Sequence, residues 1–232
     1  MWPFRQKRTL ETHGFFQGFT DWHSHILPGV GDGVPTLQES LSILSRYEQL
    51  GIREVWLTPH IMEDVPNTPE QLRERFSQLQ AAYSGSVQLH LAAENMLDAL
   101  FEERLARHDL LPIGTEGNCL LVETSYYNPP ARLPQILQRI LQQGYYVLLA
   151  HPERYLYMTD KDYRQYRQMG VRFQLNLLSL AGHYGHQVRQ RAEKLLRNQY
   201  YDCAGSDLHR EQVLSALSAV RYTEKLKFDS NI

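Results

Sequence analysis

Apolar and polar residues follow two different periods along this chain. In seven short segments the residues are mostly apolar, or apolar and polar residues alternate, which is the pattern of β-strands. Strands of this length are typical of buried sheets in globular domains. The pattern predicts strands at residues 19–25, 52–57, 87–93, 119–122, 145–150, 171–175 and 201–205.

The segments between these strands carry apolar residues three or four positions apart, as amphipathic helices do. In the first of them, Thr36 and Glu39 have the spacing of a capping box, and Gly51 marks the end. The second begins at Thr68, followed by Pro69 at the first helical position. We expect helices at residues 36–50, 68–83, 97–105, 133–141, 188–196 and 213–220, and a tyrosine-rich helix that ends at Gly170.

Seven strand–helix units follow one another without a linker, a repeat or a low-complexity segment. This order predicts a single α/β domain with parallel strands, spanning residues 19–232, preceded by an N-terminal extension at residues 1–18. Seven such units form either a closed barrel or an open doubly wound sheet.

Metal-binding residue types follow six of the seven predicted strands. A single histidine or carboxylate at a strand end is more often a solvated loop residue, but so many in one cavity require cations to hold them together. In a barrel all strand ends meet at one mouth, whereas an open sheet places them in a row. We therefore predict a seven-stranded barrel with a metal site at its mouth. The candidates are His23, His25, His60, Glu94, Glu123, His151, Asp207 and His209, while the sixth strand is followed by the neutral Asn176.

Ligands of this kind, without a thiolate, suit Mn, Fe or Zn. The other five histidines lie in predicted helices, loops or mid-strand, and we interpret them as ordinary surface or core residues. They are His13, His90, His108, His183 and His186.

Composition excludes several other classes of protein. The net charge of −2 and the absence of a basic stripe argue against a nucleic-acid partner. Two cysteines are too few for a disulfide framework, which favours a cytoplasmic location. Residues 1–8 lack the apolar region of a signal peptide, and we interpret Arg5, Lys7 and Arg8 as part of a solvated tail. No apolar run reaches the roughly 20 residues of a membrane span.

Seven short motifs resemble, in sequence order, those of the polymerase and histidinol phosphatase (PHP) superfamily. Within it, the Leu27-Pro28-Gly29 loop and the segment from His151 to Tyr155 look like the bacterial capsule-type protein tyrosine phosphatases. The resemblance runs from about Phe19 to the end of the chain. The motifs are His23-Ser24-His25, Asp32-Gly33, Thr58-Pro59-His60, Ala93-Glu94, Val122-Glu123, Ala150-His151-Pro152-Glu153-Arg154-Tyr155 and Ser206-Asp207-Leu208-His209.

This resemblance implies a distorted seven-stranded barrel and a three-metal centre, with Mn as the expected ion. It also implies a function, the dephosphorylation of a bacterial tyrosine kinase that controls exopolysaccharide export, so the expected partner is a phosphotyrosine-bearing protein tail. One departure is Gly31, where relatives often carry another acidic residue. By this resemblance one metal is held by His23, His25, Glu94 and Asp207, a second by Glu94, Glu123 and His151, and a third by Asp32, His60 and His209.

Arg154 stands three residues after His151, where its guanidinium is placed to bind a phosphate group. The alternative is a surface arginine paired with Glu153. A thiol-dependent phosphatase is not expected, because Ser125 and His209, not arginines, stand six positions after Cys119 and Cys203.

Two functions besides tyrosine dephosphorylation remain open. One is a small-molecule phosphoesterase such as a histidinol-phosphate phosphatase, and the other is a non-catalytic module stabilised by metal. For a phosphotyrosine pocket, Tyr126 and Tyr127 are better candidates than Tyr145 and Tyr146, which we expect in the core.

Overall fold

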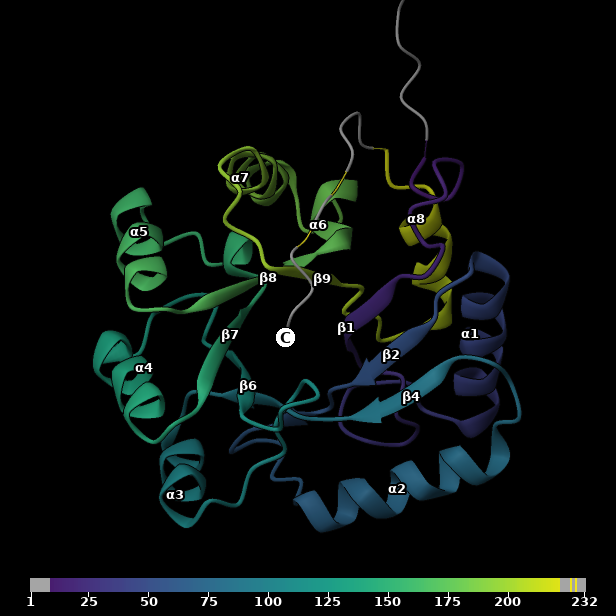
Figure 1. Ribbon diagram of the computed structural model, residues 1–232, viewed down its shortest axis with the longest axis horizontal. Helices are drawn as coiled ribbons and strands as arrows, with labels where there is room; N and C mark the ends of the chain where they lie inside the picture. The colour runs from purple at the N-terminus through teal and green to yellow at the C-terminus, as the bar shows by residue number, and fades with distance from the viewer. Residues whose placement is uncertain (1–8, 222–225, 227, 229–232) are drawn as a thin grey trace, which may run out of the picture.

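The computed structural model describes residues 9–221, 226 and 228. Figure 1 shows strands curled around a common centre, with helices α1 to α5 and α7 on the outside. The strands are β1 (Thr20–Ser24), β2 (Glu54–Leu57), β3 (His60–Ile61), β4 (Gln88–Leu91), β5 (Glu94–Met96), β6 (Cys119–Glu123), β7 (Tyr146–Ala150), β8 (Arg172–Asn176) and β9 (Cys203–Gly205).

Helices follow most of the strands, as expected for α/β units. They are α1 (Leu37–Leu50), α2 (Pro69–Ala82), α3 (Ala99–Arg107), α4 (Leu133–Gln142), α5 (Asp160–Gln168), α6 (Leu177–Ala181), α7 (His186–Arg197) and α8 (Leu214–Ser218). Two short 3₁₀ helices, Pro152–Arg154 and Glu211–Val213, complete the described elements. The α6 helix was not predicted, and the predicted last helix is a 3₁₀ turn followed by the short α8.

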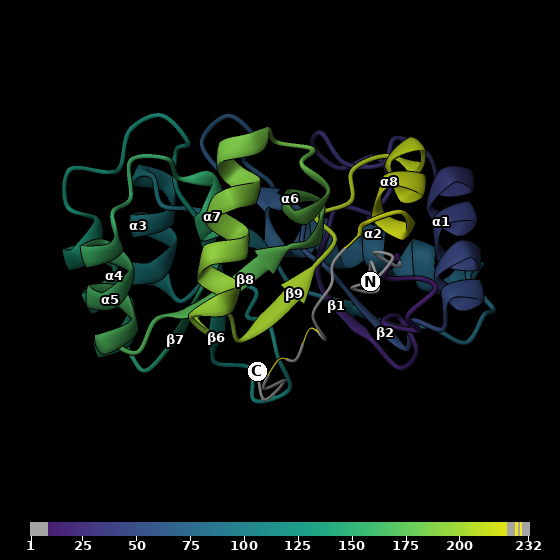
Figure 2. The same ribbon diagram turned by 90° about the horizontal axis from the view of Figure 1, so that it is seen from above.

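The strands form two parallel sheets rather than one. The order is β1-β2-β4 in the first sheet and β3-β5-β6-β7-β8-β9 in the second. Figure 2 shows β8 and β9 side by side and pointing the same way. The chain thus has an α/β fold with a curled parallel sheet, as predicted, but the predicted count of seven strands is not confirmed.

The count differs because two of the predicted strands, at residues 52–57 and 87–93, are each followed closely by a further short strand that belongs to the other sheet. After β2, Thr58 and Pro59 separate Leu57 from His60, and the chain changes from one sheet to the other. A proline has no backbone N–H to donate to a ladder, so it is found at strand ends and interruptions. The chain makes the same change of sheet between β4 and β5.

The two sheets approach each other again between β1 and β9. The backbone N–H of Asp207 donates to the carbonyl of His23 at 2.7 Å, and the N–H of His25 donates to the carbonyl of Leu208 at 3.0 Å. Ser24 and Leu208 form an isolated parallel bridge. These contacts place the segment after β9 directly beside the end of β1.

The core lies on both faces of the curled sheet. On β6, Leu120 and Val122 belong to the large cluster that packs under the helices, whereas Cys119 and Leu121 belong to a second cluster. Successive strand residues point to opposite faces, so the second cluster lies inside the curl. Both cysteines are free, buried and located in strands, in agreement with the prediction.

Two local predictions were wrong. The capping box at α1 is only half formed: Thr36 accepts the N–H of Glu39, but the Glu39 carboxylate accepts the N–H of Glu211 instead. Tyr146, which we expected in the core, is 43% exposed. By contrast, the Thr68–Gln71 box at the start of α2 is complete.

Residues 9–18, which lie in the predicted N-terminal extension, contact the rest of the chain. Leu10 and Phe16 are buried in the large cluster, and the N–H of Leu10 donates to the carbonyl of Val220 at 2.8 Å. Arg5, Lys7 and Arg8 lie outside the described residues. None of the described helices is long and apolar enough to cross a membrane.

Candidate metal centre

The predicted ligands gather where the strands end. His23 lies in β1, Glu94 begins β5 and Glu123 ends β6, while His151 and Asp207 follow β7 and β9. All five side chains are buried. His151 and Asp207 have left-handed backbone conformations, with φ of 35° and 52°, which are uncommon for residues other than glycine and cluster at functional sites.

Four of the predicted ligands, His25 among them, form a compact group around one point. Nε2 of His23 and Nε2 of His25 lie 3.1 and 3.2 Å from Oε2 of Glu94, and 3.5 and 3.3 Å from Oδ1 of Asp207. All four ligand atoms lie within 4.8 Å of one another. The group consists of the same residues that the resemblance implied for the first metal.

The second group differs in one member from the implied set. Nδ1 of His60 lies 3.1 Å from Oε2 of Glu94 and 2.9 Å from Oε1 of Glu123, so His60 stands where His151 was expected. His151 is close by, with Nε2 2.9 Å from Oε1, the other oxygen of Glu94. The two oxygens of Glu94 therefore face different histidines.

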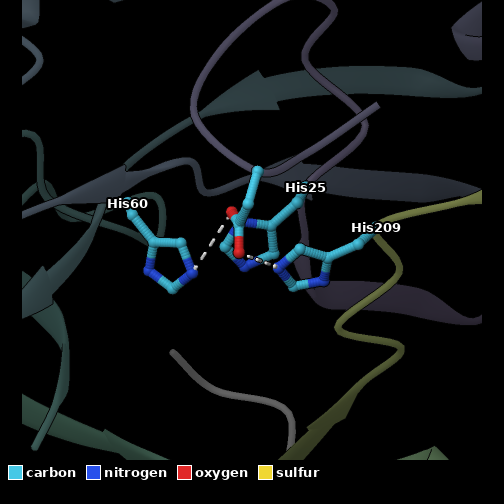
Figure 3. A group of neighbouring side chains, drawn as sticks. His25, His60 and His209 are labelled. Carbon is cyan, nitrogen blue, oxygen red and sulfur yellow. Dashed lines mark ion pairs between the residues drawn. The ribbon is translucent and has the colours of Figure 1, made fainter. Parts of the chain in front are cut away.

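The third group is more open to solvent. Figure 3 shows His25, His60 and His209 around a carboxylate, which belongs to Asp32. Oδ1 of Asp32 lies 3.7 Å from Nε2 of His60, and Oδ2 lies 3.6 Å from Nε2 of His209. These are the three implied residues, with His25 added.

The donor atoms fit divalent cations. Nδ1 of His60, Oε2 of Glu94 and Oε1 of Glu123 are buried but make no hydrogen bond, which is costly unless another partner satisfies them. Burial lowers the pKa of His23, but the carboxylates of Glu94 and Asp207 raise it to about 9. The pKa of His60 likewise rises to about 10, despite burial, beside Glu94 and Glu123. The cluster thus stabilises positive charge.

Around these groups lie two polar residues of β8 to which the sequence patterns gave no role in the site, Gln174 and Asn176. Oε1 of Gln174 lies 3.0 Å from Nδ1 of His23 and accepts the N–H of His151 at 3.2 Å. The side chain of Asn176 donates to Oδ2 of Asp207 at 2.7 Å. In β8 these two polar residues alternate with the apolar Phe173 and Leu175, so they share one face of the strand, and this alternation is a signal that points to the site side of β8.

Arg154 is linked to this centre. Its Nη1 donates to Oδ2 of Asp207 at 2.9 Å, and its side chain is 18% exposed. The alternative pairing with Glu153 is wrong: the Glu153 carboxylate is buried and accepts hydrogen bonds from the N–H of Asn176 and from the hydroxyls of Ser179 and Tyr201. Burial raises the pKa of Glu153.

Of the two tyrosine pairs, only the first reaches the centre. The hydroxyl of Tyr126 lies 3.4 Å from Oε2 of Glu123, whereas Tyr127 is 87% exposed.

The five other histidines belong to none of the three groups of described residues. Burial raises the pKa of Cys119 to about 12, so this thiol does not ionise near neutral pH.

Clusters of imidazoles and carboxylates at the carboxyl ends of parallel strands define a class, the α/β proteins that bind divalent metals for hydrolytic chemistry. The family model described as "Capsular polysaccharide synthesis, CpsB/CapC" matches residues 19–225. The chain belongs to this family, which confirms the resemblance to the capsule-type proteins.

Curated relatives and a solved structure agree with this assignment. The chain is 28% identical over 195 residues to the tyrosine-protein phosphatase YwqE of Bacillus subtilis, covering 82% of this chain and 76% of the relative. It is 28% identical over 202 residues to the tyrosine-protein phosphatase CpsB of Streptococcus pneumoniae, covering 82% of each. A chain from crystal structures of these two proteins, described as unique metal-dependent tyrosine phosphatases, matches with a TM-score of 0.76 and 26% identity, covering 84% of this chain and 81% of that one.

Proposed function

We propose that this protein is a metal-dependent phosphatase that hydrolyses phosphotyrosine. The observation that carries the proposal is the geometry of the centre: three overlapping groups of ligands share Glu94, His25 and His60, and Arg154 lies beside them on Asp207. Relatives named as tyrosine-protein phosphatases support the same reaction.

We propose nine metal ligands and a three-metal centre. The first metal belongs to His23, His25, Glu94 and Asp207, and the second to Glu94, Glu123 and His151 or His60. The third belongs to Asp32, His60 and His209. Mn is the expected ion, and Fe or Zn suits the same donors. Bound divalent ions lower the pKa of coordinated water to near neutrality and offset the charge of the phosphoryl oxygens.

The protein's own residues orient the reactants. Only Nη1 of Arg154 is seen bonded to Asp207, which leaves further N–H groups for the phosphoryl oxygens. A fixed guanidinium that binds these oxygens stabilises the charge that develops in the transition state. The two oxygens of Asp207 have different partners. Oδ1 faces His23 and His25, whereas Oδ2 accepts hydrogen bonds from Arg154 and Asn176.

The proposed substrate is a phosphotyrosine in the tail of a protein, in particular a bacterial tyrosine kinase that controls capsule or exopolysaccharide synthesis. Support comes from the family, which is described by capsular polysaccharide synthesis. Residues 19–232 are proposed as a single domain, with the two sheets together equivalent to a distorted seven-stranded barrel. A cytoplasmic location stays a prediction.

The deciding experiment compares two substrates on the Mn-loaded enzyme. A phosphotyrosine peptide is expected to be hydrolysed with a far higher kcat/KM than histidinol phosphate. The reverse order would identify a small-molecule phosphoesterase. Turnover of neither substrate, with metal bound in the expected ratio, would favour a non-catalytic module.

A further inference from the structure

Two tyrosine rings face the guanidinium group of Arg154. The carbon at its centre lies 4.2 Å from the ring centroid of Tyr126 and 4.1 Å from that of Tyr184. Tyr126 follows β6, and Tyr184 lies between α6 and α7, so the two rings come from segments almost 60 residues apart. Both rings are half-buried.

Each ring is itself held by a residue of the metal centre or its surroundings. The Tyr184 hydroxyl accepts a hydrogen bond from Nδ2 of Asn176 at 3.1 Å, and the same amide nitrogen donates to Oδ2 of Asp207. Tyr126 stacks on Tyr155 with ring centroids 5.7 Å apart, and its hydroxyl lies 3.4 Å from Oε2 of Glu123. The positions of the rings are therefore coupled to the positions of candidate metal ligands.

We propose that Tyr184 is a positioning residue that acts through Arg154. Together with Tyr126 it forms an aromatic clamp that holds the guanidinium plane while Nη1 stays bonded to Asp207. This inference rests on the proposed function, because it assumes that Arg154 binds the phosphoryl group.

The clamp restricts the rotamers that the Arg154 side chain can adopt. An arginine side chain has many rotamers, and ordering it for each binding event costs free energy. Stacking on aromatic faces stabilises a guanidinium without using its N–H groups, since the attraction runs through the ring faces. The clamp therefore leaves the edge of Arg154 available for a planar, bidentate bond to phosphate.

The test uses four single variants of the Mn-loaded protein and one double variant. Tyr184→Leu removes the ring, and Tyr184→Phe keeps the ring but removes the hydroxyl that meets Asn176. Tyr200→Leu is the matched control, because Tyr200 is also a half-buried tyrosine but packs edge-to-face against Phe173. Arg154→Ala and the double variant Arg154→Ala/Tyr184→Leu complete the set.

We expect Tyr184→Leu to lower kcat/KM for a phosphotyrosine peptide about tenfold, the effect of losing one partly buried cation–π contact. Its affinity for inorganic phosphate, measured by calorimetry, should fall in parallel, with the metal content unchanged. Tyr184→Phe should stay within about twofold of the wild type, and so should Tyr200→Leu. In the Arg154→Ala background, Tyr184→Leu should cause no further loss.

Other results overturn the inference in distinguishable ways. If Arg154→Ala impairs catalysis but Tyr184→Leu adds its full effect to it, Tyr184 does not act through Arg154. Wild-type kinetics of Tyr184→Leu, or a loss of metal in it, would also reject the clamp. If Tyr184→Phe is as impaired as Tyr184→Leu, the hydroxyl and not the ring is responsible. A wild-type Arg154→Ala would instead reject the role of Arg154 in the proposed function.

Discussion

Oε1 of Gln174 lies 3.0 Å from Nδ1 of His23, on the side of the imidazole ring opposite to Nε2, which faces Glu94 and Asp207. The same oxygen accepts the N–H of His151. One buried amide in the middle of β8 therefore orients one proposed ligand through its ring and another through its backbone.

Replacing Gln174 should weaken metal binding although Gln174 is not itself a ligand. Removal of a group that orients a metal-binding histidine typically costs about 10- to 100-fold in metal affinity. We expect Gln174→Leu to show a loss of this size in a Mn²⁺ titration. The exposed Gln187 in α7 offers a control, and equal affinities of Gln174→Leu and Gln187→Leu would contradict the role of Gln174.

Glu94 and His209 should differ in how much metal their loss removes. Oε2 of Glu94 faces His23, His25 and His60, whereas the half-buried His209 lies only in the third group. Glu94→Ala is expected to lose bound metal from two sites and His209→Ala chiefly from one. Elemental analysis of the purified variants gives the ratios, and small, equal losses would show that the ligands are assigned to the wrong sites.

Arg154→Ala should lower the rate without removing metal. Loss of one preorganised donor to the transition state typically costs about 10²–10³ in kcat, or roughly 3–4 kcal/mol. Arg154→Lys should restore only part of the activity, because lysine keeps the charge but not the planar fork. Steady-state kinetics with metal content as the control decide this, and a wild-type rate in Arg154→Ala would remove Arg154 from the mechanism.

Gly205 at the end of β9 should not tolerate a side chain. A Cβ there would lie 2.5 Å from Cβ of His23 and 2.7 Å from its backbone nitrogen, so β1 and β9 would have to move apart. Overpacking of this kind typically costs about 1–3 kcal/mol. We expect Gly205→Ala to lower both the melting temperature and the metal content. An unchanged value of either would show that β1 can shift to make room for the methyl group without that loss.

Removal of metal should abolish activity, whereas removal of both thiols should not. A chelator is expected to stop phosphotyrosine hydrolysis and Mn²⁺ to restore it, because the proposed reaction depends on metal ions held by the ligand groups. Cys119→Ala combined with Cys203→Ala should keep most of the activity, since both thiols are buried. Full activity of protein that elemental analysis finds free of metal would refute the proposed mechanism.

Much of this protein could be predicted from local sequence patterns. The parallel α/β fold follows from the alternation of two periods, and the ligand types follow from the polar residues at the ends of apolar strands. Cys119 and Cys203 were placed in buried strands on the same grounds, and the structure agrees. These features depend only on residues that are close in the chain, because the backbone geometry of a helix or strand decides which of its residues lie on the same face.

Tertiary structure alone decided how the parts meet. The change of sheet at Pro59, and the choice of His60 over His151 beside Glu123, depend on the register between strands that are distant in sequence. The same holds for the bond of Arg154 to Asp207 and for the contact of Gln174 with His23, residues 53 and 151 positions apart. A local pattern shows which face of its own strand a side chain occupies, but only the packing of all strands brings its partner within hydrogen-bond distance.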